Sequence, residues 1–257
     1  MKIGLTTYSL DNKDFREQLS SMLKNGIKPD FIIRHYGGIH KFAKRINFLR
    51  RTIKQRRLKT ISFLSSYRKK KPIQVTYKLN DEDSKQVNDF ISTTKIITVK
   101  GINHVSTIQT IKGLGEVIIA CNSGKLNSEV IGVSSAIFLN VHASKLPMYR
   151  GMNNVEWALW ENNEIYCTIH RISKGIDEGD ILLQEKIEVD TSKLKSISDY
   201  RAFCFFKRNE LMGKAISGFL DKRLLFTKQD TLGNPLAQYY TMHPILKEYL
   251  NKKLKGN

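Results

Sequence analysis

Strand-like and helix-like segments alternate along the first 142 residues, and this alternation restricts the fold more than any other feature. Five short apolar runs have the length and composition of buried strands: residues 2–9, 31–36, 96–99, 116–121 and 136–142. Three intervening segments carry apolar side chains at helical spacing: residues 15–23, 81–90 and 105–111. This order predicts an α/β fold with a mostly parallel central sheet.

The chain after residue 142 follows a different pattern. Residues 153–162 indicate an apolar helix, and two strand-like runs, 165–172 and 180–189, are close enough in sequence to form an antiparallel pair. Residues 196–220 and the tail from 239 onward read as helical. We therefore expect a main domain over residues 1–190 and a mainly helical C-terminal extension over residues 191–257.

The net charge of +19 is concentrated in one part of the chain. No acidic residue lies between Asp30 and Asp81, and we interpret residues 38–72 as a basic helical insertion, followed by a strand at 73–77. Within this insertion, apolar residues recur at helical spacing from Ile39 to Ile53. The basic face is compatible with an anionic membrane or RNA. The high lysine content of the entire chain favours a third interpretation, a packed helix with a solvated face.

Several classes of protein do not fit the composition. Apolar residues make up 40%, which is enough for a core and argues against disorder of the whole chain. No apolar run approaches the roughly 18 residues of a spanning helix, and residues 1–12 lack the apolar region of a signal peptide. The three cysteines are far apart and fit neither a zinc site nor a disulfide framework. We expect a cytoplasmic protein, and peripheral contact of residues 38–72 with the inner face of the membrane stays open.

A polar pair, Asn140 and His142, interrupts the apolar strand at 136–142 close to its end. Because strand side chains alternate, both residues face the same side, at the strand end where ligands bind in open α/β sheets. An amide N–H can stabilise an oxyanion, and an imidazole can move a proton. Asp177, between Gly175 and Gly179, is a candidate carboxylate that would orient His142 and favour its charged form. Each residue alone also has an ordinary structural explanation, but together they suit nucleophilic attack on a carbonyl.

These residues belong to three groups whose sequence resembles that of a known family. They are Asn140-Val141-His142-Ala143-Ser144 with Leu146-Pro147 and Tyr149-Arg150-Gly151, then Thr168-Ile169-His170, then Asp177-Glu178-Gly179. Their order and spacing resemble the folate-dependent formyltransferases, which include enzymes acting on glycinamide ribonucleotide, methionyl-tRNA and nucleotide-linked sugars. The resemblance implies a Rossmann-like catalytic domain and 10-formyltetrahydrofolate as the donor, with no metal. It also implies Asn140, His142 and Asp177 as the catalytic trio.

The resemblance further implies two sets of binding residues. Those expected to bind the folate are Asn122, Ser123, Gly124, Leu126, Ser144, Gly175 and Gly179. Those expected to bind the acceptor are Lys145, Tyr149, Arg150, Gly151, Thr168 and His170. Two positions depart from the family pattern: Lys145 stands where Leu is common, which suggests an anionic contact, and Tyr166 stands where Gly is common.

The resemblance says less about the identity of the acceptor amine than about the donor. Methionyl-tRNA enzymes carry a β-rich C-terminal domain, whereas this chain is short and mainly helical after Val189, and glycinamide ribonucleotide enzymes lack a long basic insertion. The organisation is most similar to sugar N-formyltransferases, so we expect a nucleotide-linked amino sugar of surface polysaccharide (lipopolysaccharide) biosynthesis. Its diphosphate would favour basic side chains. Methionyl-tRNA, glycinamide ribonucleotide and hydroxyornithine remain alternative acceptors.

Two functions of other classes stay open at this point: a nucleic-acid-binding protein on an inactive formyltransferase fold, and a hydrolase that releases formate. A homodimer is also open, with Tyr239 and Tyr240 at the contact or in the acceptor pocket, although packing is the commoner role of such a pair. Trp157 and Trp160 are three residues apart and could stack on a base, but this helical spacing favours the core.

Overall fold

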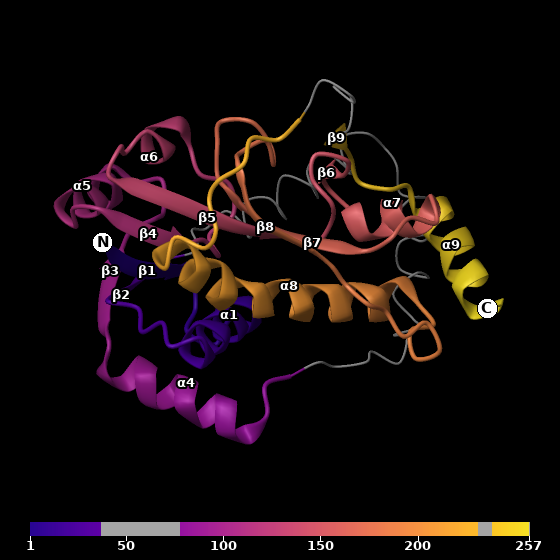
Figure 1. Cartoon of the computed structure of the whole chain (residues 1–257), viewed down its shortest axis with the longest axis horizontal. Helices are drawn as coiled ribbons and strands as arrows, with labels where there is room; N and C mark the ends of the chain where they lie inside the picture. The colour runs from indigo at the N-terminus through magenta and orange to yellow at the C-terminus, as the bar shows by residue number, and fades with distance from the viewer. Residues whose placement is uncertain (37–77, 231–237, 257) are drawn as a thin grey trace, which may run out of the picture.

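The computed structural model describes residues 1–36, 78–230 and 238–256 of the 257-residue chain (Figure 1). Its strands are β1 (Lys2–Thr7), β2 (Phe31–His35), β3 (Lys95–Val99), β4 (Val117–Ala120), β5 (Ala136–His142), β6 (Arg150–Gly151), β7 (Tyr166–Arg171), β8 (Ile181–Lys186) and β9 (Gln238–Tyr239). Its helices are α1 (Lys13–Lys24), α4 (Asp81–Thr93), α5 (Val105–Gly113), α6 (Ser128–Ile131), α7 (Asn154–Trp160), α8 (Ile197–Leu220) and α9 (Pro244–Gly256).

Seven of these strands form one central sheet in the order β3-β2-β1-β4-β5-β7-β8. The first five are parallel, and β7 and β8 extend the sheet by antiparallel pairing. The predicted α/β class, the mostly parallel sheet and the antiparallel addition are therefore confirmed. The helix expected over 39–53 and the strand expected over 73–77 lie outside the described residues.

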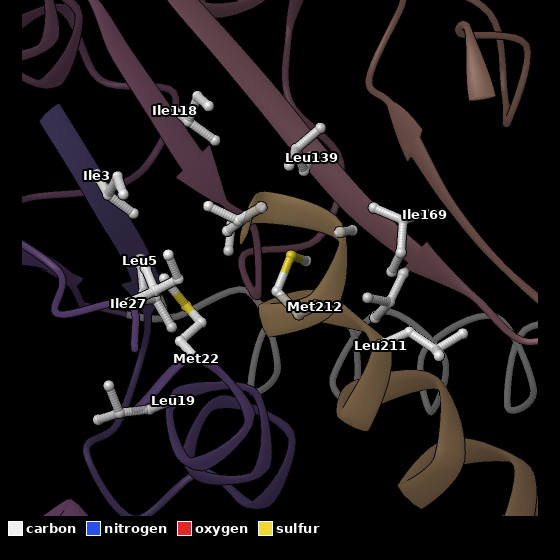
Figure 2. Close-up of a cluster of buried hydrophobic side chains, with 14 of the residues drawn as sticks. Ile3, Leu5, Leu19, Met22, Ile27, Ile118, Leu139, Ile169, Leu211 and Met212 are labelled. Atoms are coloured by element: carbon white, nitrogen blue, oxygen red, sulfur yellow. The ribbon is translucent and has the colours of Figure 1, made fainter. Parts of the chain in front are cut away.

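One face of the sheet packs against α1 and α8 (Figure 2). Leu5 of β1 and Ile118 of β4 point into this layer, where they meet Met22 of α1 and Met212 of α8. All four side chains are fully buried, so each contributes about 1.5–3 kcal/mol of hydrophobic stabilisation. The alternation within β1 and β4 explains why these residues face the helices.

The opposite face of the sheet packs against α5 and α6 (Figure 1). Ile33, Val117 and Ile119 project to this side and contact Ile111 of α5 and Val130 of α6. The sheet is thus buried on both faces, as parallel sheets usually are.

Helix α8 lies after the expected domain boundary at residue 190, yet it shares the core with the sheet. Leu211, Met212, Ala215 and Ile216 belong to the same buried cluster as the side chains of β1 and β4. The division into residues 1–190 and 191–257 stays a prediction, but the structure packs α8 as an integral layer of the main core.

The parallel strands β1, β4 and β5 end at the same edge of the sheet, at Thr7, Ala120 and His142. The loops that follow these strands therefore gather at that edge. This places the chemistry-bearing residues of β5 beside segments that are more than a hundred residues away in sequence.

Candidate functional site

A cavity of about 700 Å³ opens where these strands end. Its lining comes from the segment after β1 and the start of α1, the segment after β4, the ends of β5 and β7, the β7–β8 loop, and α8. Its lining includes Asn12, Asp14, Asn122, Ser123, Gly124, Lys125, Leu126, Asn140, Gly151, His170, Lys174, Gly175, Asp177 and Arg208. A cavity of this volume suits a small organic ligand.

Asn140 and His170 lie opposite each other on the paired strands β5 and β7. The Asn140 amide nitrogen is 3.2 Å from Nε2 of His170, and Nδ1 of His170 is 2.9 Å from the backbone oxygen of Arg171. A neutral His170 satisfies both contacts, because Nδ1 then donates to the carbonyl and Nε2 accepts from the amide. The contact leaves the second N–H of the Asn140 amide for another acceptor.

Asp177 reaches the same point from the β7–β8 loop. Its carboxylate lies 3.5 Å from Nδ1 of His142 and 3.5 Å from Nε2 of His170, one oxygen toward each ring. The backbone N–H of Gly151 donates to the same oxygen that faces His142, at 2.9 Å. Asp177 itself has a φ of 56°, a left-handed conformation that is uncommon for a residue with a Cβ.

His142 stands behind Asp177 and is not among the residues that line the cavity. Its Nε2 lies 2.7 Å from the Tyr149 carbonyl, and the Asn154 amide nitrogen is 2.9 Å from Nε2 and 3.3 Å from Nδ1. A neutral ring that donates from Nε2 to the carbonyl and accepts at Nδ1 from Asn154 is consistent with these contacts. The imidazole therefore lies behind the carboxylate, and its own hydrogen bonds go to Tyr149 and Asn154.

Burial lowers the pKa of His142 from its usual value of 6.5. The Asp177 carboxylate and the Tyr149 carbonyl act in the opposite direction, and Arg208 lowers the pKa further. Burial and the neighbouring His142 lower the pKa of His170 as well, against the opposing effect of Asp177. Both rings are thus held mainly neutral at neutral pH. The sequence-based expectation that Asp177 keeps His142 charged underestimated the desolvation of a fully buried ring.

The turn after β5 is fixed by buried hydrogen bonds. The Ser144 hydroxyl donates to the Tyr149 carbonyl at 2.8 Å, and the Thr168 hydroxyl donates to the Ser144 carbonyl at 2.7 Å. Gln184 of β8 donates to the Leu146 carbonyl and to the Thr168 hydroxyl, each at 3.0 Å. These contacts hold the chain between β5 and β6 so that Gly151 reaches Asp177.

Most residues expected to bind the folate line the cavity. Asn122, Ser123, Gly124, Leu126 and Gly175 do so. Ser144 does not, because its side chain is buried within the turn. Gly179 does not either, because it packs against β7, where a Cβ would lie 1.8 Å from the Arg171 carbonyl oxygen. The binding roles themselves stay predictions.

Of the residues expected to bind the acceptor, only Gly151 and His170 line the cavity. Thr168 and Tyr149 are buried in the turn described above. Arg150 is also buried and forms an ion pair with Glu178 at 2.8 Å. Thr168, Tyr149 and Arg150 therefore support the loops around the cavity. An acceptor that bound to their side chains directly would have to break these internal contacts.

Lys145 and Tyr166, the two residues that depart from the family pattern, contact each other. The Lys145 ammonium lies 4.9 Å from the centre of the Tyr166 ring. A cation over an aromatic ring is a favourable contact. Lys145 is thus engaged by a neighbouring strand, which is a different partner from the anionic group expected from the sequence.

Sequence reasoning missed the part of the cavity lining formed by Asn12, Asp14 and Arg208. Asn12 caps α1, which follows β1, Asp14 lies in the first turn of α1, and Arg208 lies on α8. The Arg208 guanidinium is 3.4 Å from Asp14 and 4.0 Å from the centre of the Phe205 ring. The position of Asn12 and Asp14 after the first strand was a usable signal, whereas nothing in the sequence around Arg208 marks it as a cavity residue.

The described residues contain no group of three or more His, Cys, Asp or Glu side chains that could hold a metal ion. Within the same residues, no helix has both the length and the apolar character needed to span a membrane.

Sequence comparison connects this site to known proteins. A methionyl-tRNA formyltransferase from Prochlorococcus marinus (strain MIT 9215) is 34% identical over 154 residues, which cover 56% of this chain and 46% of that protein. The chain thus spans about half the length of the curated relatives that it matches.

Structural comparison gives neighbours with the same fold. A sugar N-formyltransferase from Shewanella sp. FDAARGOS_354 has a TM-score of 0.54 at 11% identity, covering 99% of this chain and 87% of that one. An N-formyltransferase from Helicobacter canadensis, solved with folinic acid and dTDP-3-aminofucose, has a TM-score of 0.56 at 16% identity, with 99% and 80% covered.

A family model described as formyl transferase matches residues 61–204, more than half of the chain, and includes Asn140, His142, His170 and Asp177. The agreement of this match with the fold and with the geometry around Asp177 identifies the chain as a member of the formyl transferase family.

Proposed function

We propose that this protein transfers a formyl group from 10-formyltetrahydrofolate to a primary amine. The observation that carries the proposal is the convergence of Asn140, His170 and Asp177 on one wall of the cavity, with His142 directly behind the carboxylate. The loop of residues 122–126 forms another wall and offers backbone groups to the folate. Family membership supports this assignment independently of the geometry.

Asn140 stabilises the charge that develops during the reaction. The attacking amine forms a new bond to the formyl carbon, and the carbonyl oxygen becomes an oxyanion. One N–H of Asn140 is used at His170, so the other donates to this oxyanion. His170 keeps the amide oriented, because its neutral Nε2 accepts from Asn140.

Asp177 handles the proton. The carboxylate removes a proton from the attacking amine, directly or through water, and returns it to the folate nitrogen as the bond between that nitrogen and the formyl carbon breaks. The carbonyl then re-forms, which gives a formamide and tetrahydrofolate. The N–H of Gly151 holds the carboxylate in place while its charge changes, and the neutral His142 ring packs behind it.

A nucleotide-linked amino sugar is the acceptor that we favour. Lys174 and Arg208 line the cavity and supply positive charge for a diphosphate. The Helicobacter canadensis neighbour, solved with such a nucleotide sugar, shares the fold over nearly the whole chain. We place the sugar nucleotide on the wall formed by Asn12, Asp14 and Arg208, because the loop at 122–126 is assigned to the folate.

Methionyl-tRNA is a second candidate, favoured by a different observation. The methionyl-tRNA formyltransferase of Prochlorococcus marinus is far more similar in sequence than the structural neighbours are. The proposed chemistry is identical for both acceptors, because each presents a primary amine to the same formyl group.

We also propose a cytoplasmic location, a peripheral membrane contact of residues 38–72 and a homodimer. Tyr239 is already engaged within the chain, where it packs against Tyr149 and Trp157. Tyr240 is 71% exposed and is the better candidate for a contact between copies.

The test is a transfer assay with 10-formyltetrahydrofolate, followed by the absorbance change as the folate loses its formyl group. The acceptor panel contains amino sugars linked to dTDP and UDP, methionyl-tRNA, glycinamide ribonucleotide and hydroxyornithine. The variants are Asn140→Ala, His142→Ala and Asp177→Asn. Asn88→Ala, an exposed position on α4, is the matched control.

Turnover that depends on one acceptor and falls about 100-fold or more in Asn140→Ala, but not in Asn88→Ala, would support the proposal and identify the amine. Formate release without any amine would instead identify a hydrolase. A protein that does not bind the donor, yet binds RNA in a salt-dependent manner, would contradict the proposal and favour the nucleic-acid-binding alternative.

A further inference from the structure

Gln229 lies far from the reacting groups in sequence but next to them in space. The segment that follows α8 runs beside the edge strand β8, where Thr227 and Ile181 exchange two backbone hydrogen bonds of 2.8 Å each. This pairing fixes the backbone two residues before Gln229. The side chain of Gln229 then extends toward the loop between β7 and β8.

The Gln229 amide nitrogen donates to two backbone carbonyls of that loop. It lies 2.9 Å from the oxygen of Asp177 and 2.7 Å from the oxygen of Gly179. Each of its two N–H bonds therefore has one acceptor. Gln229 joins the residues on either side of Glu178 into a single closed turn.

The Asp177 turn needs such support because its backbone is strained. The φ of 56° at Asp177 is unfavourable for a residue with a Cβ and persists only where the surroundings enforce it. On the inner side, Gly179 packs so tightly against the Arg171 carbonyl that no Cβ would fit. On the outer side, the amide of Gln229 holds the two carbonyls. The carboxylate of Asp177 leaves the turn between these two constraints.

We propose that Gln229 is a positioning residue that fixes the backbone of the Asp177 turn and thereby aims the carboxylate between His142 and His170. The proposal rests on the proposed function for its kinetic consequence. Gln229 does not line the cavity, so it acts only through Asp177. Because Gln229 follows α8, the C-terminal part of the chain helps to position the carboxylate of Asp177.

Two substitutions separate this role from simple packing. Gln229→Met retains the length of the side chain and removes both donors. Gln229→Glu also retains the length but directs a carboxylate at two carbonyl oxygens, which repel it. At low pH the introduced carboxyl takes up a proton and regains one donor, so only this variant has a route to recovery. Lys228→Met, an exposed neighbour on the same segment, is the matched control.

In Gln229→Met we expect kcat to fall by about tenfold to a hundredfold, since small misplacements of a reacting group have effects of this size. KM for the donor and for the amine should stay within about twofold, because no binding contact is removed. The ratio of kcat in Gln229→Glu to kcat in the wild type should rise as the pH is lowered, whereas the ratio for Gln229→Met should stay constant. Lys228→Met should match the wild type.

Hydrogen exchange of a peptide covering residues 173–180 tests the same contact without any turnover. We expect faster exchange in Gln229→Met than in Lys228→Met, because the turn loses two hydrogen bonds. Unchanged exchange, or an unchanged kcat in an active enzyme, would overturn the role of Gln229. A wild-type protein without formyl transfer would overturn the proposed function instead, and the exchange result would still decide whether Gln229 fixes the turn.

Discussion

The two buried histidines beside Asp177, His142 and His170, make the stability of the protein sensitive to acid. The pKa values of His142 and His170 lie below 6.5 in the folded state, whereas the unfolded chain titrates near that value. As the pH falls below 6.5, both histidines bind protons in the unfolded state but stay neutral in the folded state. The free energy of unfolding therefore decreases, by up to about 1.4 kcal/mol per pH unit for each ring, until the lowered pKa is reached.

Replacing one ring should reduce this slope. We expect His170→Asn to be less stable than the wild type at pH 7, because it loses buried contacts, but to lose less stability between pH 6.5 and 5. Urea unfolding at a series of pH values measures both quantities. An identical slope in variant and wild type would show that His170 does not contribute to the pH dependence.

Arg208 provides a residue-scale test of where the acceptor binds. Its guanidinium lines the cavity beside Asp14, so a diphosphate or another anionic group on the acceptor would compete for it. We expect Arg208→Met to raise KM for the acceptor about tenfold or more, as the loss of a charge-assisted hydrogen bond predicts. KM for the donor should be unchanged in steady-state measurements.

Lys207→Met is the control for Arg208, because Lys207 adjoins it on α8 and pairs with the partly exposed Glu210. Both variants lose one positive charge, so a general effect of net charge would appear in both. An equal rise in KM for the two variants would contradict a specific contact at Arg208.

The proximity of Asn140, His142 and Asp177 agrees with the sequence-based prediction, which rested on the polar pair in β5 and on the family resemblance, while their catalytic roles stay predictions. An amide and an imidazole near the end of an apolar strand, and a carboxylate between glycines, have no simple packing explanation as a set. Arg208 and Gln229 carry no such signal. Their positions depend on how α8 and the segment after it return to the sheet, which no local pattern specifies.

At the scale of elements, the crossing of α1 and α8 depends on Gly213. A Cβ at this position would lie 2.1 Å from the backbone oxygen of Ser21, and a backbone atom cannot move aside as a flexible side chain can. We expect Gly213→Ala to push the helices apart and to lower the free energy of unfolding by about 1–3 kcal/mol, the usual cost of overpacking. Denaturant unfolding measures this change.

Gly113, the last residue of α5, offers the matched substitution. A Cβ there meets nothing within 4 Å, and alanine is the better helix former. Gly113→Ala should therefore be neutral or slightly stabilising. If Gly213→Ala were equally neutral, the close approach of α1 and α8 would be wrong.

The regular elements were predictable to within a few residues where their own periodicity defines them. The helix expected at 105–111 extends over Val105–Gly113, and the strand expected at 136–142 matches β5. The pairing of β6 with β9 was not predictable, because it joins two residues near 150 to two residues near 238. Such short, distant pairings depend on the packing of everything between them.

At the scale of the whole molecule, α8 connects regions that the sequence suggested were separate. Its C-terminal half lies in the core beneath the sheet, with Met212 and Ile216. Its N-terminal half, with Tyr200 and Cys204, lies in a second buried cluster that also contains Val155 of α7. Disruption of either cluster should therefore reach the other through one continuous helix, and we expect the described elements to unfold together.

The two tryptophans make this expectation measurable. Trp157 of α7 packs against this second cluster, and both Trp157 and Trp160 pack against a smaller cluster that contains Leu250 of α9. Ile118, in contrast, is buried on β4 in the core beneath the sheet. We expect Ile118→Val to cost about 1 kcal/mol and to lower the melting temperature by about 3 °C. The shift should be the same by tryptophan fluorescence and by far-ultraviolet circular dichroism. Ile245→Val, at a residue that is 61% exposed on α9, should shift neither signal. A shift in the dichroism alone would show that the clusters around α7 unfold independently of the sheet.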